Sequence, residues 1–227
     1  MGFDIRKLNN QLKRTFIESF SLKDAKVLDM GCGAGGDFHK WREALVGHLV
    51  AADPASGAIA QARQRRVHGP DSLEFVTGEI NRVPVIKFDF IFWNFSLQYV
   101  FDSAGHLDHT INEMVRRSKP GTTVAGVLPD SQRIFMLPED RFEDPQGNKV
   151  IKGPLTGDLG DKVAFFVRGA PYYRGGPIEE PLAWRDLFVT KMEAAGFVLY
   201  TWRPFSLQYT GLVTDLYSCF AFSFRGI

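Results

Sequence analysis

The segment from Val27 to Asp37 (VLDMGCGAGGD) places a carboxylate and several glycines directly after an apolar run. The apolar run predicts a buried strand, and the glycines predict a tight turn that leads into a helix. Glycine accepts a positive φ and lets a ligand approach the backbone without meeting a Cβ. Open α/β sheets bind ligands at the carboxyl ends of their strands. The segment therefore predicts a ligand site at this turn, with Asp29 at the tip of the strand.

Gly31, Gly33 and Gly36 also fit the GxGxxG pattern of dinucleotide-binding turns. The charge of Asp29, two residues before Gly31, disfavours a pyrophosphate there. It favours a ligand that carries positive charge, such as the amino group and sulfonium of S-adenosylmethionine. The arrangement resembles motif I of the class I methyltransferases. The alternative is a glycine turn that only lets a helix pack on a strand.

Two further carboxylates follow the next predicted strands. Asp53 lies 17 residues after Gly36, at the end of a strand predicted over 47–53. A carboxylate there can accept both hydroxyls of a ribose, and the alternative is a cap for the helix that opens at Pro54. Glu79 follows a strand predicted over 73–77, where this kind of fold contacts adenine. An exposed loop glutamate fits the same position.

Strands and helices alternate up to about residue 129, which predicts a parallel sheet covered by helices on both faces. The first five predicted strands are 26–30, 47–53, 73–77, 88–94 and 122–128, and the helices between and before them are 4–20, 35–45, 54–66 and 103–118. A helix over 182–195 follows, and then strands over 197–205 and 217–224, which we expect to pair antiparallel. The fold class is therefore α/β: a Rossmann-like class I methyltransferase fold, with a seven-stranded, mostly parallel sheet whose last strand is antiparallel.

The length of 227 residues fits a single domain over 1–227. Residues 138–180 are rich in Gly, Pro, Asp and Lys, with one strand-like run over 162–167. Long segments of this kind are usually functional or disordered. We interpret this one as an insertion or lid beside the binding face.

The net charge of +1 disfavours a broad polyanion-binding face, so a nucleic-acid partner is expected to be held in one pocket. The two cysteines, Cys32 and Cys219, fit no metal-ligand spacing and no disulfide framework. A reducing compartment is therefore expected. No apolar run approaches the ~20 residues of a membrane span, and the first ten residues lack the apolar region of a signal peptide. We expect no membrane partner and no secretion.

Four separated segments give the chain a resemblance to one family, the mRNA cap guanine-N7 methyltransferases. They are residues 9–13 (NNQLK), 29–37 (DMGCGAGGD), 94–101 (NFSLQYVF) and 127–131 (VLPDS). A glutamate at 179 and a tyrosine at 217 match later positions of the family, and the adjacent Glu180 is the alternative for the glutamate. The glycine segment is shared by many methyltransferases, whereas the first and third segments are much more specific.

The resemblance implies S-adenosylmethionine as the methyl donor and a capped RNA 5′ end (GpppN) as the partner, alongside other capping-enzyme domains or subunits. The residues it implies for the donor are Lys13, Asp29, Gly31, Gly33, Asp53, Glu79, Asn94 and Ser96. Those it implies for the cap are Asn9, Asp37, Gln98, Tyr99, Pro129, Glu179 and Tyr217. It implies a nuclear location for a cellular protein and a cytoplasmic one for a viral capping enzyme.

Two positions depart from the family pattern. Ala34 stands where the family usually has a lysine that contacts the cap, and Gln98 stands where it usually has histidine. The loss of the lysine removes a positive charge beside a triphosphate bridge. Either cap affinity is lower or another basic residue supplies the charge, and the candidates are Arg14, Lys40, Arg133 and Arg174.

The implied reaction needs no acid–base residue and no metal, because guanine N7 has a free lone pair and the sulfonium is already activated. Alignment of the reacting atoms would be the main contribution of the protein. Two alternatives stay open from the sequence. One is another class I methyltransferase with a small-molecule or protein substrate, and the other is a catalytically silent subunit of a capping complex.

Overall fold

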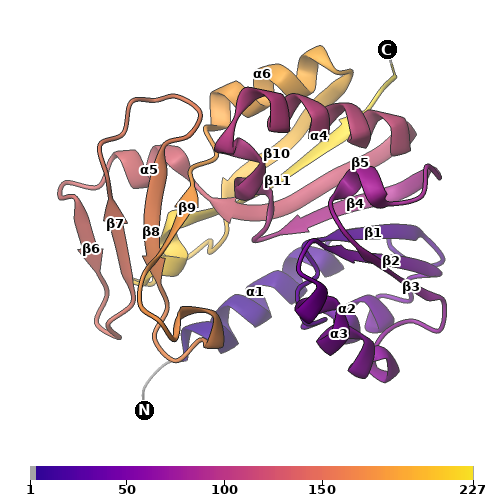
Figure 1. Ribbon diagram of the computed structural model, residues 1–227, viewed down its shortest axis with the longest axis horizontal. Helices are drawn as coiled ribbons and strands as arrows, with labels where there is room; N and C mark the ends of the chain where they lie inside the picture. The colour runs from indigo at the N-terminus through magenta and orange to yellow at the C-terminus, as the bar shows by residue number, and fades with distance from the viewer. Residues whose placement is uncertain (1–3, 227) are drawn as a thin grey trace.

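The computed structural model describes residues 4–226, and a seven-stranded sheet forms its centre (Figure 1). Its strands are β1 (Lys26–Met30), β2 (His48–Asp53), β3 (Leu73–Thr77), β4 (Phe88–Asn94), β5 (Ser118–Pro129), β10 (Phe197–Pro204) and β11 (Tyr217–Phe224). The order across the sheet is β10-β11-β5-β4-β1-β2-β3. Strand β11 alone runs in the direction opposite to the other strands of this sheet. The predicted sheet and its antiparallel last strand are confirmed.

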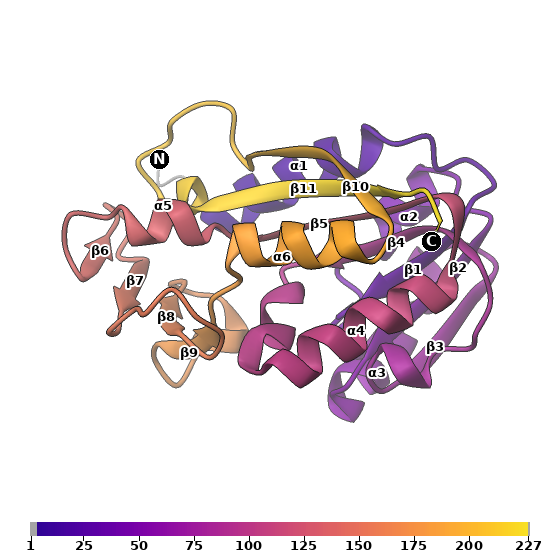
Figure 2. The ribbon, with the colours of Figure 1, turned by 90° about the horizontal axis from the view of Figure 1, so that it is seen from above.

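Helices cover both faces of the sheet. They are α1 (Ile5–Glu18), α2 (Phe38–Glu43), α3 (Ser56–Gln64), α4 (Ala104–Arg117) and α6 (Arg185–Ala194). Figures 1 and 2 show α4 and α6 together on one side and α1 and α2 on the other. Each face has its own apolar core, so the central strands are buried on both sides, as expected for a parallel sheet.

The order of the strands reverses between β1 and β4. Chain connections leave these two neighbouring strands in opposite directions, which opens a crevice at their carboxyl ends. Three segments meet there: the turn after β1, the segment after β2, and the 3₁₀ helix η3 (Leu97–Asp102) that follows β4. The topology therefore assembles the predicted ligand turn with residues from several distant parts of the chain.

A second sheet forms within the segment predicted as an insertion. Its four antiparallel strands are β6 (Arg141–Glu143), β7 (Lys149–Lys152), β8 (Lys162–Phe166) and β9 (Ile178–Pro181). The sequence predicted only the third of them. Val150, Val163 and Phe165 join the apolar core that also contains α1 and β11, so this sheet packs against the main one. Figure 1 shows it at one end of the molecule, next to the short helix α5 (Ser131–Phe135).

The remaining differences from prediction lie at element ends. Helix α2 begins at Phe38 rather than at residue 35, because Gly35 has a φ of 75°, which is incompatible with a helix. Short 3₁₀ segments occupy other connections: η1 (Arg66–His68), η2 (Ile80–Arg82), η4 (Pro171–Tyr173) and η5 (Val213–Leu216). In the part of the chain that is described, no helix is both long and apolar enough to cross a bilayer.

Candidate functional site

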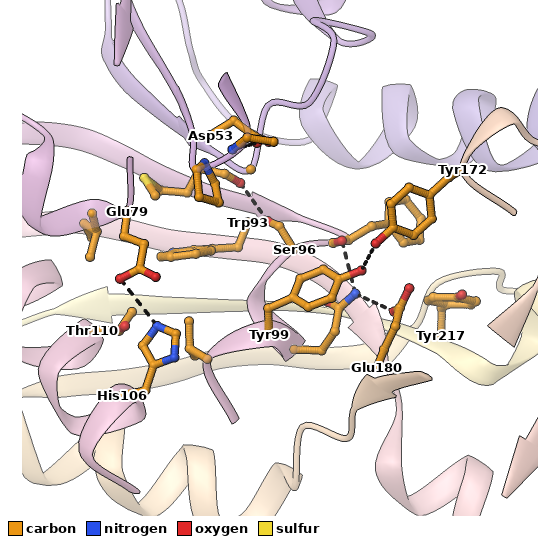
Figure 3. Close-up of a pocket in the computed structure, with 18 of the residues that line it drawn as sticks. Asp53, Glu79, Trp93, Ser96, Tyr99, His106, Thr110, Tyr172, Glu180 and Tyr217 are labelled. Atoms are coloured by element: carbon orange, nitrogen blue, oxygen red, sulfur yellow. Dashed lines mark hydrogen bonds and ion pairs between the residues drawn. The ribbon is translucent and has the colours of Figure 1, made fainter. Parts of the chain in front are cut away.

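A cavity of about 560 Å³ opens at the crevice between the two halves of the main sheet. This volume lies in the range of small-molecule sites. Figure 3 shows two ends to the cavity: Asp53, Glu79 and His106 lie towards one end, and Tyr172, Glu180 and Tyr217 lie towards the other. The first end belongs to the main sheet, whereas the small sheet contributes much of the second.

The glycine turn holds the carboxylate of Asp53 in a fixed orientation at the first end. The backbone N–H of Gly33 donates to Oδ2 of Asp53 at 2.9 Å, and the N–H of Ala55 donates to Oδ1 at 2.9 Å. Each oxygen keeps a second lone pair, and Asp53 lines the cavity. The N-cap of α3 is Ala55, so Asp53 does not have the helix-cap role that was the alternative.

Close packing at the tips of β1 and β4 explains why position 31 is glycine. Gly31 has a φ of 71°, and a Cβ there would stand 2.3 Å from the Cβ of Ser96. The Ser96 hydroxyl donates to the carbonyl oxygen of Met30 at 2.7 Å, which joins the two strand tips. Phe95, between β4 and η3, has a φ of 61°, and bulky residues rarely adopt this conformation away from functional sites.

A buried charge cluster lies behind the glycine turn. Lys13 pairs with Asp37 at 2.7 Å, and Lys40 pairs with the other oxygen of Asp37 at 2.6 Å. Asp29 accepts a hydrogen bond from Nε1 of Trp41 at 3.0 Å. Burial, together with the charge of Asp37, raises the pKa of Asp29 to about 7. A nearby cation would stabilise the ionised carboxylate of Asp29. A cationic ligand would therefore favour the ionised form.

The first end of the cavity contains a buried polar group that no described residue satisfies. The indole N–H of Trp93, which lines the cavity, is buried without a hydrogen-bond partner. Both amide atoms of the adjacent Asn94, which lies outside the lining, also lack a partner. His106 also lines this end, with Nε2 3.7 Å from Glu79 and Nδ1 2.9 Å from Asp102. Buried polar groups are usually hydrogen-bonded. The indole N–H of Trp93 therefore fits a ligand that offers a hydrogen-bond acceptor at this end, as an adenine ring does.

The second end is built around the buried carboxylate of Glu180. Its Oε2 accepts from Nε2 of Gln98 at 2.9 Å, and its Oε1 faces the hydroxyl of Tyr173 at 3.4 Å. Burial raises the pKa of Glu180. Tyr99 and Tyr172 meet at their hydroxyls, 3.1 Å apart, beside this carboxylate (Figure 3). The arrangement of one carboxylate among four tyrosines, with Tyr217 as the fourth, suits a planar base with N–H donors along one edge.

The sequence predicted a cap-binding carboxylate at Glu179, with the adjacent Glu180 as the alternative, and the structure places only the side chain of Glu180 in the cavity lining. Glu179 is exposed, whereas Glu180 is only 4% exposed and lines the cavity. The cause is the two-residue period of β9, because Glu180 pairs with the buried Val163 and shares its face. The face of a strand is unknown until its partner is known, and β9 was not predicted.

The other predicted residues divide into two groups. Eight line the cavity: Asn9, Gly31, Asp53, Glu79, Ser96, Gln98, Tyr99 and Tyr217. Six more lie outside its lining, and their binding roles stay predictions: Lys13, Asp29, Gly33, Asp37, Asn94 and Pro129. The carboxylate of Asp37 is already held by two lysines, and Pro129 is buried opposite Tyr217 in the register of β5 and β11.

Sequence reasoning missed several lining residues, namely Trp93, Phe95, His106, Tyr172 and Tyr173. One signal was present, since Tyr172 and Tyr173 are adjacent aromatics in a stretch rich in glycine and proline. His106 gave no signal, because it lies in α4 and reaches the site only through the packing of that helix.

Among residues 4–226, no three His, Cys, Asp or Glu side chains gather as a metal site would require. The expectation that the reaction needs no metal stays a prediction. The titratable carboxylates that line the cavity are Asp53, Glu79 and Glu180.

Comparison with known proteins gives these features a context. Residues 2–153 match the family model of the mRNA (guanine-N(7))-methyltransferase domain. A relative from Cryptococcus neoformans var. neoformans serotype D (strain B-3501A), an mRNA cap guanine-N(7) methyltransferase, is 30% identical over 167 residues, which are 67% of this chain and 24% of the relative. The mRNA cap guanine-N(7) methyltransferase 1 of Arabidopsis thaliana is 28% identical over 148 residues, 58% of this chain and 40% of the relative. The chain thus spans less than half the length of these relatives.

Among solved structures, the CcbJ methyltransferase from Streptomyces caelestis superposes with a TM-score of 0.65 at 12% identity, covering 95% of both chains. At this identity the likeness concerns the fold. It agrees with the seven-stranded sheet and its antiparallel strand.

Proposed function

Because the chain belongs to the mRNA (guanine-N(7))-methyltransferase family, we propose that it transfers a methyl group from S-adenosylmethionine to N7 of the guanine that caps RNA. The observation that carries the proposal is the two-ended cavity. A fixed carboxylate on a glycine turn lies at one end, and a buried carboxylate among tyrosines lies at the other.

The residues of the first end fit the methyl donor. Asp53 would accept the two ribose hydroxyls through the lone pairs that the backbone leaves free. Trp93 and Glu79 would lie against the adenine, where the indole N–H lacks a partner. Asp29, behind the turn, would face the positive charge of the donor. When bound, S-adenosylmethionine supplies a methyl group that its sulfonium has already activated.

The residues of the second end fit guanine. Glu180 would accept from N1–H and from the exocyclic N2–H₂, and adenine lacks this pair of donors. Tyr99 offers a ring for stacking, and base–aromatic stacking contributes ~1–3 kcal/mol per base. Gln98, which already donates to Glu180, would hold the carboxylate in place.

The chain's own contribution to catalysis would be alignment and exclusion of water. Guanine N7 carries a free lone pair at neutral pH, so no side chain has to remove a proton. Holding two reactants in near-attack geometry can contribute about 7–11 kcal/mol. The tyrosines of the small sheet would also cover the reacting base from solvent.

The test is a methyl-transfer assay on RNA ending in GpppG and on RNA ending in ApppG, with mass mapping of the methylated atom. We expect transfer to the first RNA only, with the methyl on N7 of the cap guanine. Asp53→Ala should abolish methyl transfer, and this loss would show that the activity does not come from a contaminating enzyme. Asp71→Ala, at an exposed position before β3, should retain methyl transfer. Binding of S-adenosylhomocysteine without methyl transfer to capped RNA would support the alternative that the chain is a catalytically silent subunit of a capping complex. Methylation of another substrate class would support a different methyltransferase.

A further inference from the structure

The cavity lining is acidic, whereas the proposed substrate is a polyanion. Asp53, Glu79 and Glu180 line the cavity, and no lysine or arginine among residues 4–226 is part of its lining. A GpppN end carries a triphosphate bridge next to the guanine. An exposed phosphate contact is usually supplied by arginine or lysine. If the chain binds this substrate, a cation must stand at the rim of the cavity.

Three of the four basic residues that could compensate for Ala34 are already engaged. Arg14 forms an ion pair with Glu43. Lys40 is 2% exposed and is held by Asp37. Arg133 donates to the carbonyl oxygen of Asp215 at 3.2 Å. Using any of them for a phosphate would require breaking an existing contact.

Arg174 differs from these three residues. It is exposed, and its side chain has no hydrogen-bond or ion-pair partner within residues 4–226. It directly follows η4, whose residues Tyr172 and Tyr173 line the cavity. Arg168 also lies near the rim, after the lining residue Val167, but its side chain lies against Gly147 in the turn between β6 and β7.

The turn that carries Arg174 is anchored beside the second end of the cavity. Nη1 of Arg6 in α1 donates to the carbonyl oxygen of Gly169 at 3.0 Å, which ties the segment before η4 to the main part of the molecule. Tyr173 faces Glu180, and the hydroxyl of Tyr172 lies 3.1 Å from that of Tyr99 (Figure 3). Tyr172 is itself 59% exposed, so its ring is accessible to a ligand.

We propose that η4 and Arg174 form a cap-contacting segment, in which Tyr172 contacts the guanine and Arg174 contacts the triphosphate bridge. The proposal rests on the proposed function and extends it. In this proposal Arg174 supplies the positive charge that a lysine at position 34 supplies in the family. Arg174 lies in the connection between β8 and β9, after residues 2–153, which are the part of the chain that matches the family model.

The test measures binding to the full chain by calorimetry, with GpppG, guanosine and S-adenosylhomocysteine as separate probes. We expect Arg174→Ala to weaken GpppG binding about fivefold to tenfold, which is within the range for the net contribution of one ordinary hydrogen bond, because this contact is exposed to solvent. Guanosine and S-adenosylhomocysteine should bind as before. Arg174→Lys should recover part of the loss. The matched control is Arg225→Ala. Arg225 is an exposed arginine that follows the last residue of β11, whereas the lining residue Tyr217 is the first residue of that strand.

The tyrosine half of the proposal has its own variants. Tyr172→Ala should weaken the binding of both GpppG and guanosine by about fivefold or more, because the stacking ring is lost for either ligand. Tyr200→Ala, at an exposed position of β10, is the control.

The outcomes separate two kinds of failure. If the wild-type chain binds GpppG and the Arg174 variants match Arg225→Ala, this inference is overturned and the proposed function stands. If the wild-type chain binds S-adenosylhomocysteine but neither GpppG nor guanosine, the proposed function fails and this inference fails with it. If Arg174→Ala weakened the binding of GpppG and of guanosine equally, the assignment of Arg174 to the triphosphate bridge would also be overturned.

Discussion

Replacing Glu180 with glutamine tests the base-recognition end of the cavity most sharply, because its neighbour provides a matched control. Glu179 and Glu180 are adjacent in β9, but one side chain is exposed and the other is 4% exposed beside Gln98. Glu180→Gln removes the charge and one of the two acceptors, whereas the shape of the side chain is nearly unchanged. Glu179→Gln makes the same chemical change on the solvent face.

The expected magnitude follows from the hydrogen bonds. A hydrogen bond to a charged group contributes about 1.5–3 kcal/mol, so the loss of one such bond to guanine should weaken cap binding about 10- to 150-fold. Glu179→Gln should change binding by less than about twofold, as surface substitutions usually do. The assay is calorimetric titration with GpppG, and titration with S-adenosylhomocysteine serves as the control for folding.

The same carboxylate should give cap binding a pH dependence. Burial raises the pKa of Glu180, so the acid should take up a proton at a higher pH than an ordinary glutamate does. GpppG affinity should therefore fall as the pH falls through this raised pKa, and Glu180→Gln should abolish that dependence. A larger effect from Glu179→Gln would show that the assigned face of β9 is wrong. No effect from either variant would refute guanine recognition by this strand.

Four further predictions concern the glycine turn and its neighbours. Asp53→Ala should weaken S-adenosylhomocysteine binding at least about 100-fold in calorimetry, because two hydrogen bonds to a charged group are lost; unchanged affinity would refute the ribose assignment. Since the pKa of Asp29 is about 7 and a cationic donor needs the carboxylate, donor affinity should rise about tenfold from pH 6 to pH 8, and a flat profile would contradict this role. Gly31→Ala should lower the free energy of unfolding in urea by about 1–3 kcal/mol or more through clash and strain, whereas Gly36→Ala, where a Cβ meets nothing within 4 Å, should change it by less than about 0.5 kcal/mol; equal losses would contradict the packing argument. Ala34→Lys should tighten GpppG binding and leave S-adenosylhomocysteine binding unchanged, and no gain would indicate that the phosphates lie elsewhere.

The main sheet could be predicted because its signals are local. The strands β1, β3, β4 and β11 have the predicted bounds, since each is a run of mostly apolar residues ended by a turn or a polar residue. Asp53 and Glu79 were placed correctly at the cavity because the carboxyl ends of parallel strands meet at one edge.

The small sheet could not be predicted in the same way. Its strands β6, β7 and β9 are only three or four residues long and mix charged with apolar residues. Their pairing, not their composition, defines them, and pairing also decides which of Glu179 and Glu180 faces the cavity. The pairing of Lys13 with Asp37 was hidden for a related reason, because it depends on how α1 crosses the glycine turn.

A structure of the chain with S-adenosylhomocysteine and GpppG bound together tests the central claim most directly. The account predicts the ribose hydroxyls on Asp53 and the N1–N2 edge of the guanine on Glu180, with N7 directed towards the sulfur. An adenosyl group bound away from the glycine turn would contradict the account. So would a guanine whose N7 faces away from the donor.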